Sequence, residues 1–433
     1  MTYDEKVKLI ADYIKSGEKD EADFKIGFEA EHFTIDKDNL ISTSYTEGGG
    51  VRDILEAITD KGFEGSYEKE NIMGLSGDDA SISIEPAAQF EVAFDPKGTI
   101  DELFDLYKAN MKKIIPEFDK RDKLLVTVGY QPKSKIDDLV FIPKERYKYM
   151  SKYFKEFGGS MPLNMMKGSA SLQAAIDYKN EADFKKKFFV ANAISTFLYS
   201  TFDNAYIFEG EVYQKHNIRQ SIWKNCESSR SGIYDFAFDD DLTYKSYAKK
   251  ILDTDSIFIH ENGEDVYTGD TKFEQIFDKD SSKDMIYHAL SIVFPDVRVK
   301  KYMEVRMPDS LPYPYNMAAV ALIKNIFYDK EILDYLYEDV FKGFTYEDSN
   351  KLRDAAVIDG INTLYKDKEI WEWMLDVIDR IKEDMKYLDP LKELLEKQMT
   401  PRDIYENLYK LDPKKALYEF SVNKFVSDIN GQN

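Results

Sequence analysis

The stretch Ser81-Ile-Ser-Ile-Glu-Pro-Ala-Ala-Gln-Phe-Glu-Val-Ala-Phe94 decides the fold. Apolar and polar residues alternate on both sides of Pro86, and a period of two is typical of a β-strand with one apolar and one polar face. A proline inside such a run indicates a bulge or a sheet edge at that point. We therefore predict a strand whose bulge turns Glu85 towards the polar face that carries Gln89 and Glu91.

Three other stretches, residues 24–32, 169–178 and 299–306, alternate in the same way. In each, the apolar residues predict one face of a strand and the polar residues predict the other. The polar faces carry Glu29, Glu31, Gln173, Glu304 and Arg306. Four strands therefore offer carboxylates, an amide and an arginine to one surface of a predicted sheet.

Carboxylates gathered on one sheet face need a balancing charge. Two of them about 4 Å apart repel by roughly 4 kcal/mol at an effective dielectric constant of about 20. Glutamate and glutamine oxygens suit Mg²⁺ or Mn²⁺ better than zinc, and magnesium usually completes its coordination shell with water and phosphate. The four strands together predict a metal–nucleotide site for phosphoryl chemistry. For any single strand the alternative is a solvated outer face, which is common in an acidic protein.

The overall composition disfavours some classes of binding partner. The chain has 433 residues, with 81 acidic and 59 basic residues and a formal net charge of −22. A net anion of this size disfavours sequence-independent binding to nucleic acid or to anionic membranes. Cys226 is the only cysteine, which excludes an intrachain disulfide, and the four histidines are too scattered to predict a zinc cluster. Without a signal-peptide core or an apolar run of about 18 residues, we expect a soluble, cytoplasmic protein.

No repeat, low-complexity segment or flexible linker divides the chain. We predict one domain over residues 1–433 with an α+β fold, in which residues 316–433 are mostly helical. The segment Thr99-Ile-Asp-Glu102 has the pattern of a capping box and predicts the start of a helix. Arg219 and Arg230 stand on either side of Trp223. Because a guanidinium fits carboxylates and phosphates, these arginines predict a clamp for an anionic substrate; the alternative is ordinary surface ion pairing.

Several short motifs follow one another in a fixed order. They are Phe28-Glu-Ala-Glu-His-Phe33, Ser83-Ile-Glu-Pro-Ala-Ala-Gln-Phe-Glu91, Gly129-Tyr-Gln-Pro-Lys133, Pro143-Lys-Glu-Arg-Tyr147, Ile222-Trp223, Arg230-Ser-Gly232, Phe238-Asp-Asp240, Phe294-Pro-Asp-Val-Arg298, Tyr302-Met-Glu-Val-Arg306 and Asp309. In this order they resemble motifs of the plant and proteobacterial glutamate–cysteine ligases, such as Glu-x-Glu and Ser-Leu-Glu-Pro-Gly-Gly-Gln-Phe-Glu. Those enzymes belong to the glutamine synthetase-like superfamily of carboxylate–amine ligases.

The resemblance implies a fold, a reaction and a set of site residues. The fold is a curved antiparallel sheet shaped as a half-barrel funnel with surrounding helices. The reaction joins L-glutamate to L-cysteine through γ-glutamyl phosphate, with consumption of ATP and with Mg²⁺, or Mn²⁺ as the alternative, in a monomer or a homodimer. The implied metal ligands are Glu29, Glu31, Glu85, Glu91 and Glu304. The resemblance also implies catalytic roles for Arg306 and Glu304, ATP contacts from Gln173, Gln89 and Arg306, and substrate contacts from Arg219, Arg230 and Trp223.

Departures from the family pattern keep the second substrate open. Family members often have Arg-Thr-x-Thr-Val-Gln-Val-Asn where this chain has Gly168-Ser-Ala-Ser-Leu-Gln-Ala-Ala175, so Gly168 replaces an arginine and Ala175 an asparagine. One alternative is therefore a related ligase that uses glutamate with another amine, or another acid. A phosphotransferase resembling guanidino kinases and a non-catalytic small-molecule binder are further alternatives. The retained Glu29, Glu31, Glu304 and Arg306 disfavour the binder.

Overall fold

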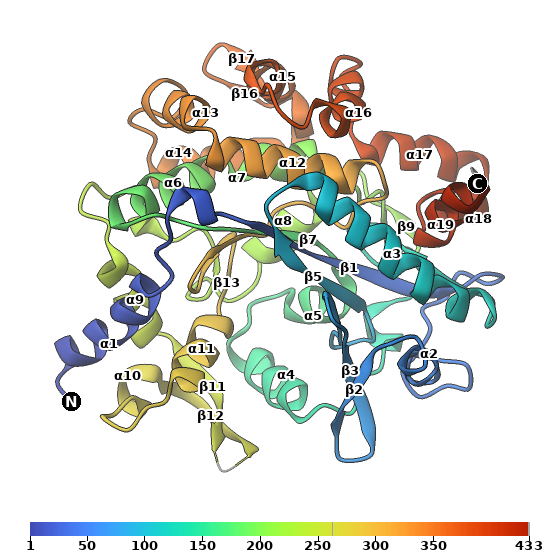
Figure 1. The fold of residues 1–433 in the computed structure, drawn as a ribbon, viewed down its shortest axis with the longest axis horizontal. Helices are drawn as coiled ribbons and strands as arrows, with labels where there is room; N and C mark the ends of the chain where they lie inside the picture. The colour runs from blue at the N-terminus through green and yellow to red at the C-terminus, as the bar shows by residue number, and fades with distance from the viewer. Residues whose placement is uncertain (262, 432–433) are drawn as a thin grey trace.

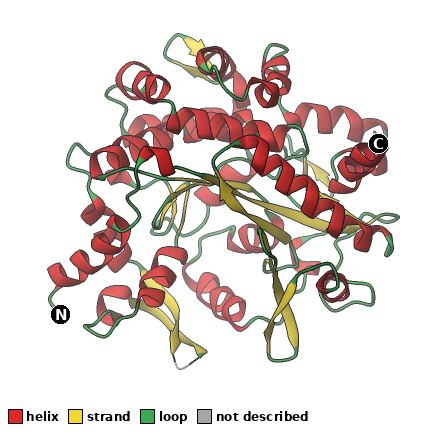
Figure 2. Ribbon diagram, viewed as in Figure 1, coloured by secondary structure: helices red, strands yellow, loops and turns green. Residues whose placement is uncertain are grey.

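A computed structural model describes residues 1–261 and 263–431. An open antiparallel sheet crosses the middle of the molecule and lies between layers of helices (Figures 1 and 2). Across the described residues its strands follow the order β14-β15-β7-β1-β5-β4-β3-β2, and β6 pairs with the far end of β1. Their bounds are β1 (Ile26–Asp36), β2 (Glu64–Glu68), β3 (Asn71–Ser76), β4 (Ala80–Ile84), β5 (Phe90–Lys97), β6 (Lys123–Val126), β7 (Leu172–Ile176), β14 (Val297–Val299) and β15 (Met303–Val305).

Helices and short strand pairs surround this sheet. The shorter strands are β8 (Ile207–Phe208), β9 (Glu211–Val212), β10 (Ser231–Gly232), β11 (Asp255–Glu261), β12 (Glu264–Lys272), β13 (Phe294–Pro295), β16 (Leu364–Tyr365) and β17 (Lys368–Glu369). The helices before the last strand of the main sheet are α1 (Tyr3–Lys15), α2 (Val51–Thr59), α3 (Ile100–Asp119), α4 (Glu145–Phe157), α5 (Pro162–Gly168), α6 (Glu181–Ala193), α7 (Ser195–Thr201), α8 (Ile218–Lys224), α9 (Tyr244–Leu252), α10 (Phe273–Ile276) and α11 (Lys283–Ser291).

The C-terminal portion is mostly helical, as the sequence predicts. Its helices are α12 (Tyr315–Tyr328), α13 (Lys330–Tyr335), α14 (Tyr346–Asp359), α15 (Ile370–Arg380), α16 (Met385–Leu395), α17 (Pro401–Leu411), α18 (Pro413–Glu419) and α19 (Val422–Gly431). The predicted α+β class with an antiparallel sheet is confirmed, and so is the capping box, because Thr99 and Glu102 cap α3 reciprocally. The single domain over residues 1–433 remains a prediction. No helix among the described residues has the length and apolar character needed to span a membrane.

The stretch around Pro86 forms two strands, so the prediction of one bulged strand is wrong. β4 and β5 form an antiparallel hairpin in which Ser83 lies opposite Glu91. The turn between them contains Pro86, which has no backbone donor for a strand ladder, and Ala88, whose φ of 67° is left-handed. The backbone N–H of Glu85 donates to the carbonyl of Gln89 at 2.9 Å and closes the turn. Glu85 therefore projects from a turn at the end of the sheet.

Strand register gathers the polar residues on one face of the sheet. Glu31 lies opposite Glu91 across β1 and β5, and Glu29 lies opposite Gln173 across β1 and β7. Further along, Glu304 of β15 is paired with Arg298 of β14 on one side and with Ala175 of β7 on the other. Side chains of directly paired residues lie on the same side of a sheet. The four stretches with alternating patterns therefore build one polar surface.

The opposite face of the sheet is apolar and packs against α3 and α12, which cross it in Figure 1. Phe28 and Phe94 stack across β1 and β5 with ring centroids 4.6 Å apart, and both rings contact Tyr107 of α3. Burial of these large rings fixes which face of each strand points inward. The polar face of the sheet is not covered by these helices and lines a cavity.

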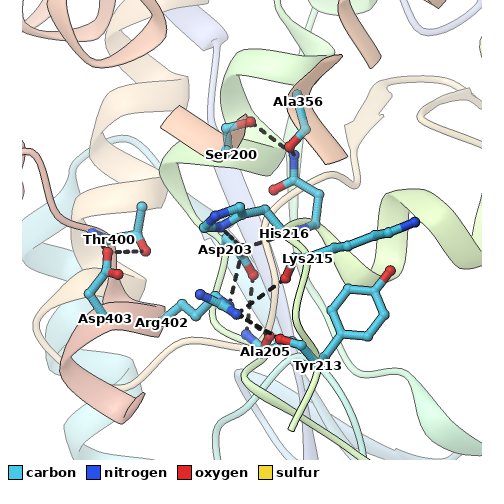
Figure 3. A network of polar contacts seen from close by, with 12 residues as sticks. Ser200, Asp203, Ala205, Tyr213, Lys215, His216, Ala356, Thr400, Arg402 and Asp403 are labelled. Carbon is cyan, nitrogen blue, oxygen red and sulfur yellow. Dashed lines mark hydrogen bonds and ion pairs between the residues drawn. The ribbon is translucent and has the colours of Figure 1, made fainter. Parts of the chain in front are cut away.

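The C-terminal helices are attached to the loop that follows α7 by a buried polar network (Figure 3). Arg402 of α17 donates to the carbonyls of Ala205 at 3.3 Å, Tyr213 at 2.9 Å and Lys215 at 3.2 Å. Its backbone N–H also donates to the carbonyl of Asp203 at 2.9 Å. The next residue in that loop, Asn204, contacts the segment after β15, so α17 supports a part of the chain that approaches the polar face of the sheet.

Candidate active site

A cavity of about 370 Å³ opens over the polar face of the sheet. Its other walls come from α4, α5, α8, α11 and the β11–β12 hairpin. A second cavity of about 180 Å³ lies nearer the start of β1 and includes Glu304 and Ala175 in its wall. Both cavities are bounded by Glu29 and Gln173. These two residues therefore form part of the wall of each cavity.

Four of the five predicted metal ligands, Glu29, Glu31, Glu85 and Glu91, line the larger cavity. Glu31 is the most firmly held, because it accepts hydrogen bonds from Ser171 N at 2.6 Å and Gln173 Nε2 at 3.0 Å. Glu91 accepts a hydrogen bond of 2.6 Å from the Ser83 hydroxyl. The sequence prediction that these carboxylates converge is therefore met in position, while their role as ligands remains a prediction.

Crowding and burial oppose ionisation of these carboxylates. Burial raises the pKa of Glu91 well above its ordinary value, and Glu29, Glu85 and Glu31 raise it further. Burial and Glu304 raise the pKa of Glu29, and burial and Glu85 raise that of Glu31. Carboxylates that repel one another in a buried site are stabilised by a bound cation.

A cluster of cations forms the wall beside these carboxylates. Arg298, Lys300 and Arg306 all line the larger cavity, and all three pair with Glu304, which is only 2% exposed. The Lys300 Nζ lies 2.7 Å from Glu304 Oε1, Arg298 Nε donates to Oε2, and Arg306 Nη1 is 3.6 Å from Oε2. Burial raises the pKa of Glu304, but the three cations together hold it below its ordinary value. The cluster keeps an excess of positive charge.

Gln173 connects the two charged groups. Its Nε2 donates to Glu31, and its Oε1 accepts a hydrogen bond from the Arg306 guanidinium. The amide thereby fixes the position of the Arg306 side chain relative to the carboxylates. Gln89 also lines the cavity, but its amide holds the β4–β5 turn, since Oε1 accepts from Ala87 N at 2.8 Å and Nε2 donates to the Met166 carbonyl at 3.0 Å.

The donor set fits a hard divalent cation in its chemistry. Glu29, Glu31, Glu85 and Glu91 present carboxylate oxygens to one cavity, and oxygen ligands are those that Mg²⁺ prefers. Glu304 fits less well, because its oxygens are already paired with three cations. Among residues 1–261 and 263–431, no three His, Cys, Asp or Glu side chains are grouped closely enough to hold a metal by themselves. Waters and phosphate oxygens would therefore have to complete the shell, as is usual for magnesium.

Two of the three predicted substrate-binding residues line the larger cavity. Arg219 and Trp223 of α8 line the larger cavity, and Trp223 stacks on Phe294 with ring centroids 6.1 Å apart. Arg219 is braced by the carbonyls of Met307 at 2.9 Å and Pro308 at 3.0 Å, while its Nε forms no hydrogen bond within the described part of the chain. Its charge lowers the pKa of Glu31, which places it near the carboxylates.

Arg230 is not among the residues that line the cavity, and its substrate-binding role stays a prediction. It is 0% exposed, and its guanidinium is occupied by Glu227 at 2.6 Å and by the carbonyls of Ile292 and Asp255, both at 2.9 Å. The guanidinium therefore stabilises the packing of β11 and the end of α11. The sequence around Arg230 does not reveal whether the guanidinium points into a site or into the core.

Sequence reasoning assigned no role of their own to two groups of cavity residues. Arg146 and Tyr147, at the start of α4, line the cavity near Glu85, and Arg146 Nε forms no hydrogen bond within the residues described. Arg298 and Lys300 form the second group. Their alternation with Val297 and Val299 was the available signal, since a strand with buried apolar residues places its charged residues on the opposite face.

Gly168 and Ala175, the two departures from the family pattern, lie next to Tyr130 and Glu304. A Cβ added at Gly168 would approach the Tyr130 ring within 2.6 Å, so Tyr130 fills the space of a side chain there. Ala175 lies in the wall of the smaller cavity, next to Glu304. Both positions are therefore close to the candidate site.

Comparison with protein families gives a match over residues 25–407 to glutamate–cysteine ligase family 2. Curated relatives include the chloroplastic glutamate–cysteine ligase A of Oryza sativa subsp. indica, which is 26% identical over 422 residues that cover 93% of this chain and 84% of the relative. The chloroplastic enzymes of Medicago truncatula and Arabidopsis thaliana are 27% and 26% identical, and the alignments cover 92% and 93% of this chain and 81% and 79% of theirs.

Among solved structures, the fold is similar to that of glutamate–cysteine ligase from Francisella tularensis in complex with AMP. The TM-score is 0.56 with 14% sequence identity, and the alignment covers 93% of this chain and 89% of the other. At that identity the likeness concerns the fold. It agrees with the half-open sheet and the surrounding helices described above.

Proposed function

This chain belongs to glutamate–cysteine ligase family 2, and from that membership we propose that it joins the γ-carboxylate of L-glutamate to the amine of L-cysteine with hydrolysis of ATP. The observation that carries the proposal is the cavity in which four carboxylates face a cluster of three cations, with Gln173 between them. A nucleotide polyphosphate with a divalent cation needs both kinds of group. The named relatives are glutamate–cysteine ligases, and the solved neighbour holds AMP.

The chemistry requires an activated acid. A carboxylate does not react with an amine at neutral pH, so ATP first transfers its γ-phosphoryl group to the glutamate side chain. The amine then attacks the acyl carbon, and phosphate leaves. In such transfers catalysis consists of positioning and of stabilising charge on the phosphoryl oxygens. No nucleophilic side chain is needed.

Different residues of this chain serve the phosphoryl transfer and the binding of the substrates. We assign Arg306 to the transferring phosphoryl group, because its guanidinium faces the cavity and is held by Gln173 and Glu304. Arg298 and Lys300 attract the remaining phosphate charge. Glu304 acts as a positioning residue that holds these cations together. This role for Glu304 differs from the metal-ligand role that the family resemblance implies.

Glu29, Glu31, Glu85 and Glu91 would hold Mg²⁺ or Mn²⁺, which when bound neutralises phosphate charge. We assign Arg146, Arg219 and Trp223 to the amino-acid substrate. Within residues 1–261 and 263–431, the Nε of each arginine has no hydrogen-bond partner, and a buried guanidinium with a free donor binds a carboxylate strongly.

The proposed function predicts a specific product. Incubation of the protein with ATP, Mg²⁺, L-glutamate and L-cysteine should give γ-glutamylcysteine by mass spectrometry, with one phosphate released for each amide formed. A panel of other amines and acids, run in parallel, tests the alternative suggested by Gly168 and Ala175. Consumption of ATP without any amide would favour a phosphotransferase, and the absence of both ATP consumption and amide would exclude a ligase.

Mg²⁺ should stabilise the folded protein against heat. The raised pKa values of Glu29, Glu31 and Glu91 mean that the folded state binds protons more tightly than the unfolded chain, so stability falls as the pH rises through these values. A cation bound among the ionised groups offsets this loss. At a free concentration of 100 times its Kd, the cation adds about 2.7 kcal/mol to the free energy of unfolding.

Differential scanning fluorimetry at pH 8, with and without Mg²⁺, measures this effect. The rise in Tm should be much smaller in Glu91→Gln and unchanged in Glu211→Gln, which removes an exposed carboxylate of β9. An equal rise in both variants would place the bound cation elsewhere.

A further inference from the structure

The cavity wall opposite the sheet contains a pair of histidines that the ligase chemistry described above does not use. His260 of β11 and His288 of α11 both line the cavity, and their rings meet edge to face with centroids 4.7 Å apart. The His260 side chain is 57% exposed, which places it at the open mouth.

The two imidazole rings have different hydrogen-bonding partners. The Nδ1 of His260 is in close contact with the Asp265 carboxylate on the neighbouring strand β12, and within the described residues its Nε2 forms no hydrogen bond. His288 donates through Nε2 to the Phe258 carbonyl at 2.8 Å, since a carbonyl can only accept. Burial lowers the pKa of His288 to about 4, so this ring stays neutral. His260 is thus the member of the pair whose ring is held by a carboxylate at the mouth of the cavity.

Charged and titratable groups lie on each element that packs on β11. β12 contributes Asp265, Glu264 and Tyr267; α4 contributes Arg146, Glu145 and Tyr149; and α11 contributes His288 and Tyr287. Among them Asp265 makes the direct contact with the His260 ring. A carboxylate behind an imidazole fixes its tautomer and stabilises the imidazolium that forms when the other nitrogen accepts a proton.

Resting on the proposed function, we infer that His260 is the general base that removes a proton from the ammonium group of the incoming amino acid, with Asp265 as its positioning residue. An amino acid carries its amine as ammonium near neutral pH, and that nitrogen has no electron pair for attack. One proton passes from the ammonium to His260 Nε2, and the free amine then forms the C–N bond with the acyl carbon. The second proton leaves the nitrogen for solvent as the tetrahedral adduct collapses. The C–O bond to phosphate then breaks, and its electron pair stays on the phosphate oxygen.

The test compares two acceptors in the full-length enzyme. Hydroxylamine is a much weaker base than an amino acid and is largely unprotonated at pH 7, so it needs no base. The variant His260→Ala should lose about 10²-fold or more in kcat/KM for cysteine, the size of a general-base contribution, yet retain most of the wild-type rate of γ-glutamyl hydroxamate formation. Raising the pH should restore part of the cysteine rate, because more of the amine is then free. The Asp265→Asn variant should show the same pattern with a smaller loss.

The matched controls are Glu264→Gln, on the same hairpin with an exposed side chain, and His260→Gln, which keeps the size of the side chain without its basicity. Glu264→Gln should behave as wild type, and His260→Gln should behave as His260→Ala. A parallel loss with cysteine and hydroxylamine would overturn the inference, because it would indicate damage to the phosphoryl step or to the hairpin. Full cysteine activity in His260→Ala would overturn it too. Wild-type enzyme that forms hydroxamate but no γ-glutamylcysteine would instead refute the proposed acceptor.

Discussion

Replacing Arg306 by alanine is expected to reduce ligase activity by about 10³-fold or more, the size of effect typical of an arginine that stabilises a transferring phosphoryl group. The guanidinium faces the cavity between Gln173 and Glu304, at the meeting point of the two charged groups. The loss should fall mainly on kcat, because the interaction is strongest when charge moves onto the phosphoryl oxygens. Glutamate-dependent formation of ADP, measured with hydroxylamine as acceptor, reports this step directly.

The variant Arg306→Lys separates charge from geometry. A lysine keeps the positive charge but lacks the planar fork that reaches Gln173 and a phosphoryl group together, so we expect a loss of similar order. Arg380→Ala, which removes an exposed arginine of α15 paired with Asp376, should leave the rate unchanged. Retention of more than a tenth of the activity in Arg306→Ala would contradict the assigned role.

Replacing Glu304 by alanine is expected to lower the free energy of unfolding by about 3–5 kcal/mol, the usual cost of removing one partner from a buried ion pair. The change leaves Arg298, Lys300 and Arg306 together in a buried site without the carboxylate that pairs with all three. Urea denaturation followed by circular dichroism measures the loss. Added ATP should recover part of it, because its phosphates supply the missing negative charge.

The pH dependence of this effect has a definite sign. The folded-state pKa of Glu304 lies below its unfolded value, so its contribution to stability is fully present above the ordinary glutamate pKa and disappears as the pH falls below that value. The difference in stability between wild type and Glu304→Ala should therefore be constant from pH 6 to 8 and shrink in acid. Glu347→Ala, an exposed carboxylate paired with Lys351, should change stability by less than about 1 kcal/mol at any pH. A Glu304→Ala protein as stable as wild type would show that the cations separate when the carboxylate is removed.

Alternating patterns allowed the sheet and its polar face to be predicted from sequence alone. Period-two burial is a local property, so residues 24–32 and 169–178 gave strands with the correct face inward. In the stretch 299–306 only Met303–Val305 form the predicted strand, because residues 300–302 form the turn between β14 and β15. The stretch around Pro86 was harder, because alternation continues across a turn of five residues and does not show that the chain reverses. The left-handed Ala88 at that turn has no signal in its residue type.

The roles of individual charges depended on contacts that sequence does not contain. Glu304 resembles the other carboxylates in sequence, but its cross-strand partner is Arg298, and that pairing is the reason why we propose that it holds cations. Arg230 has the chemistry of a substrate clamp, yet its guanidinium is consumed by Glu227 and two carbonyls. Conversely, the role proposed for His260 depends on the hairpin that brings Asp265 behind its ring.

The attachment of α17 has a consequence for how the enzyme matures on the ribosome. Arg402 holds Asp203, the neighbouring Asn204 donates to Asp309 at 2.8 Å, and Asp309 pairs with Arg219 at the edge of the cavity. A nascent chain that has not yet emerged as far as α17 lacks the first link in this series. The catalytic cleft is therefore completed late in translation, after the strands that form its floor have long been made.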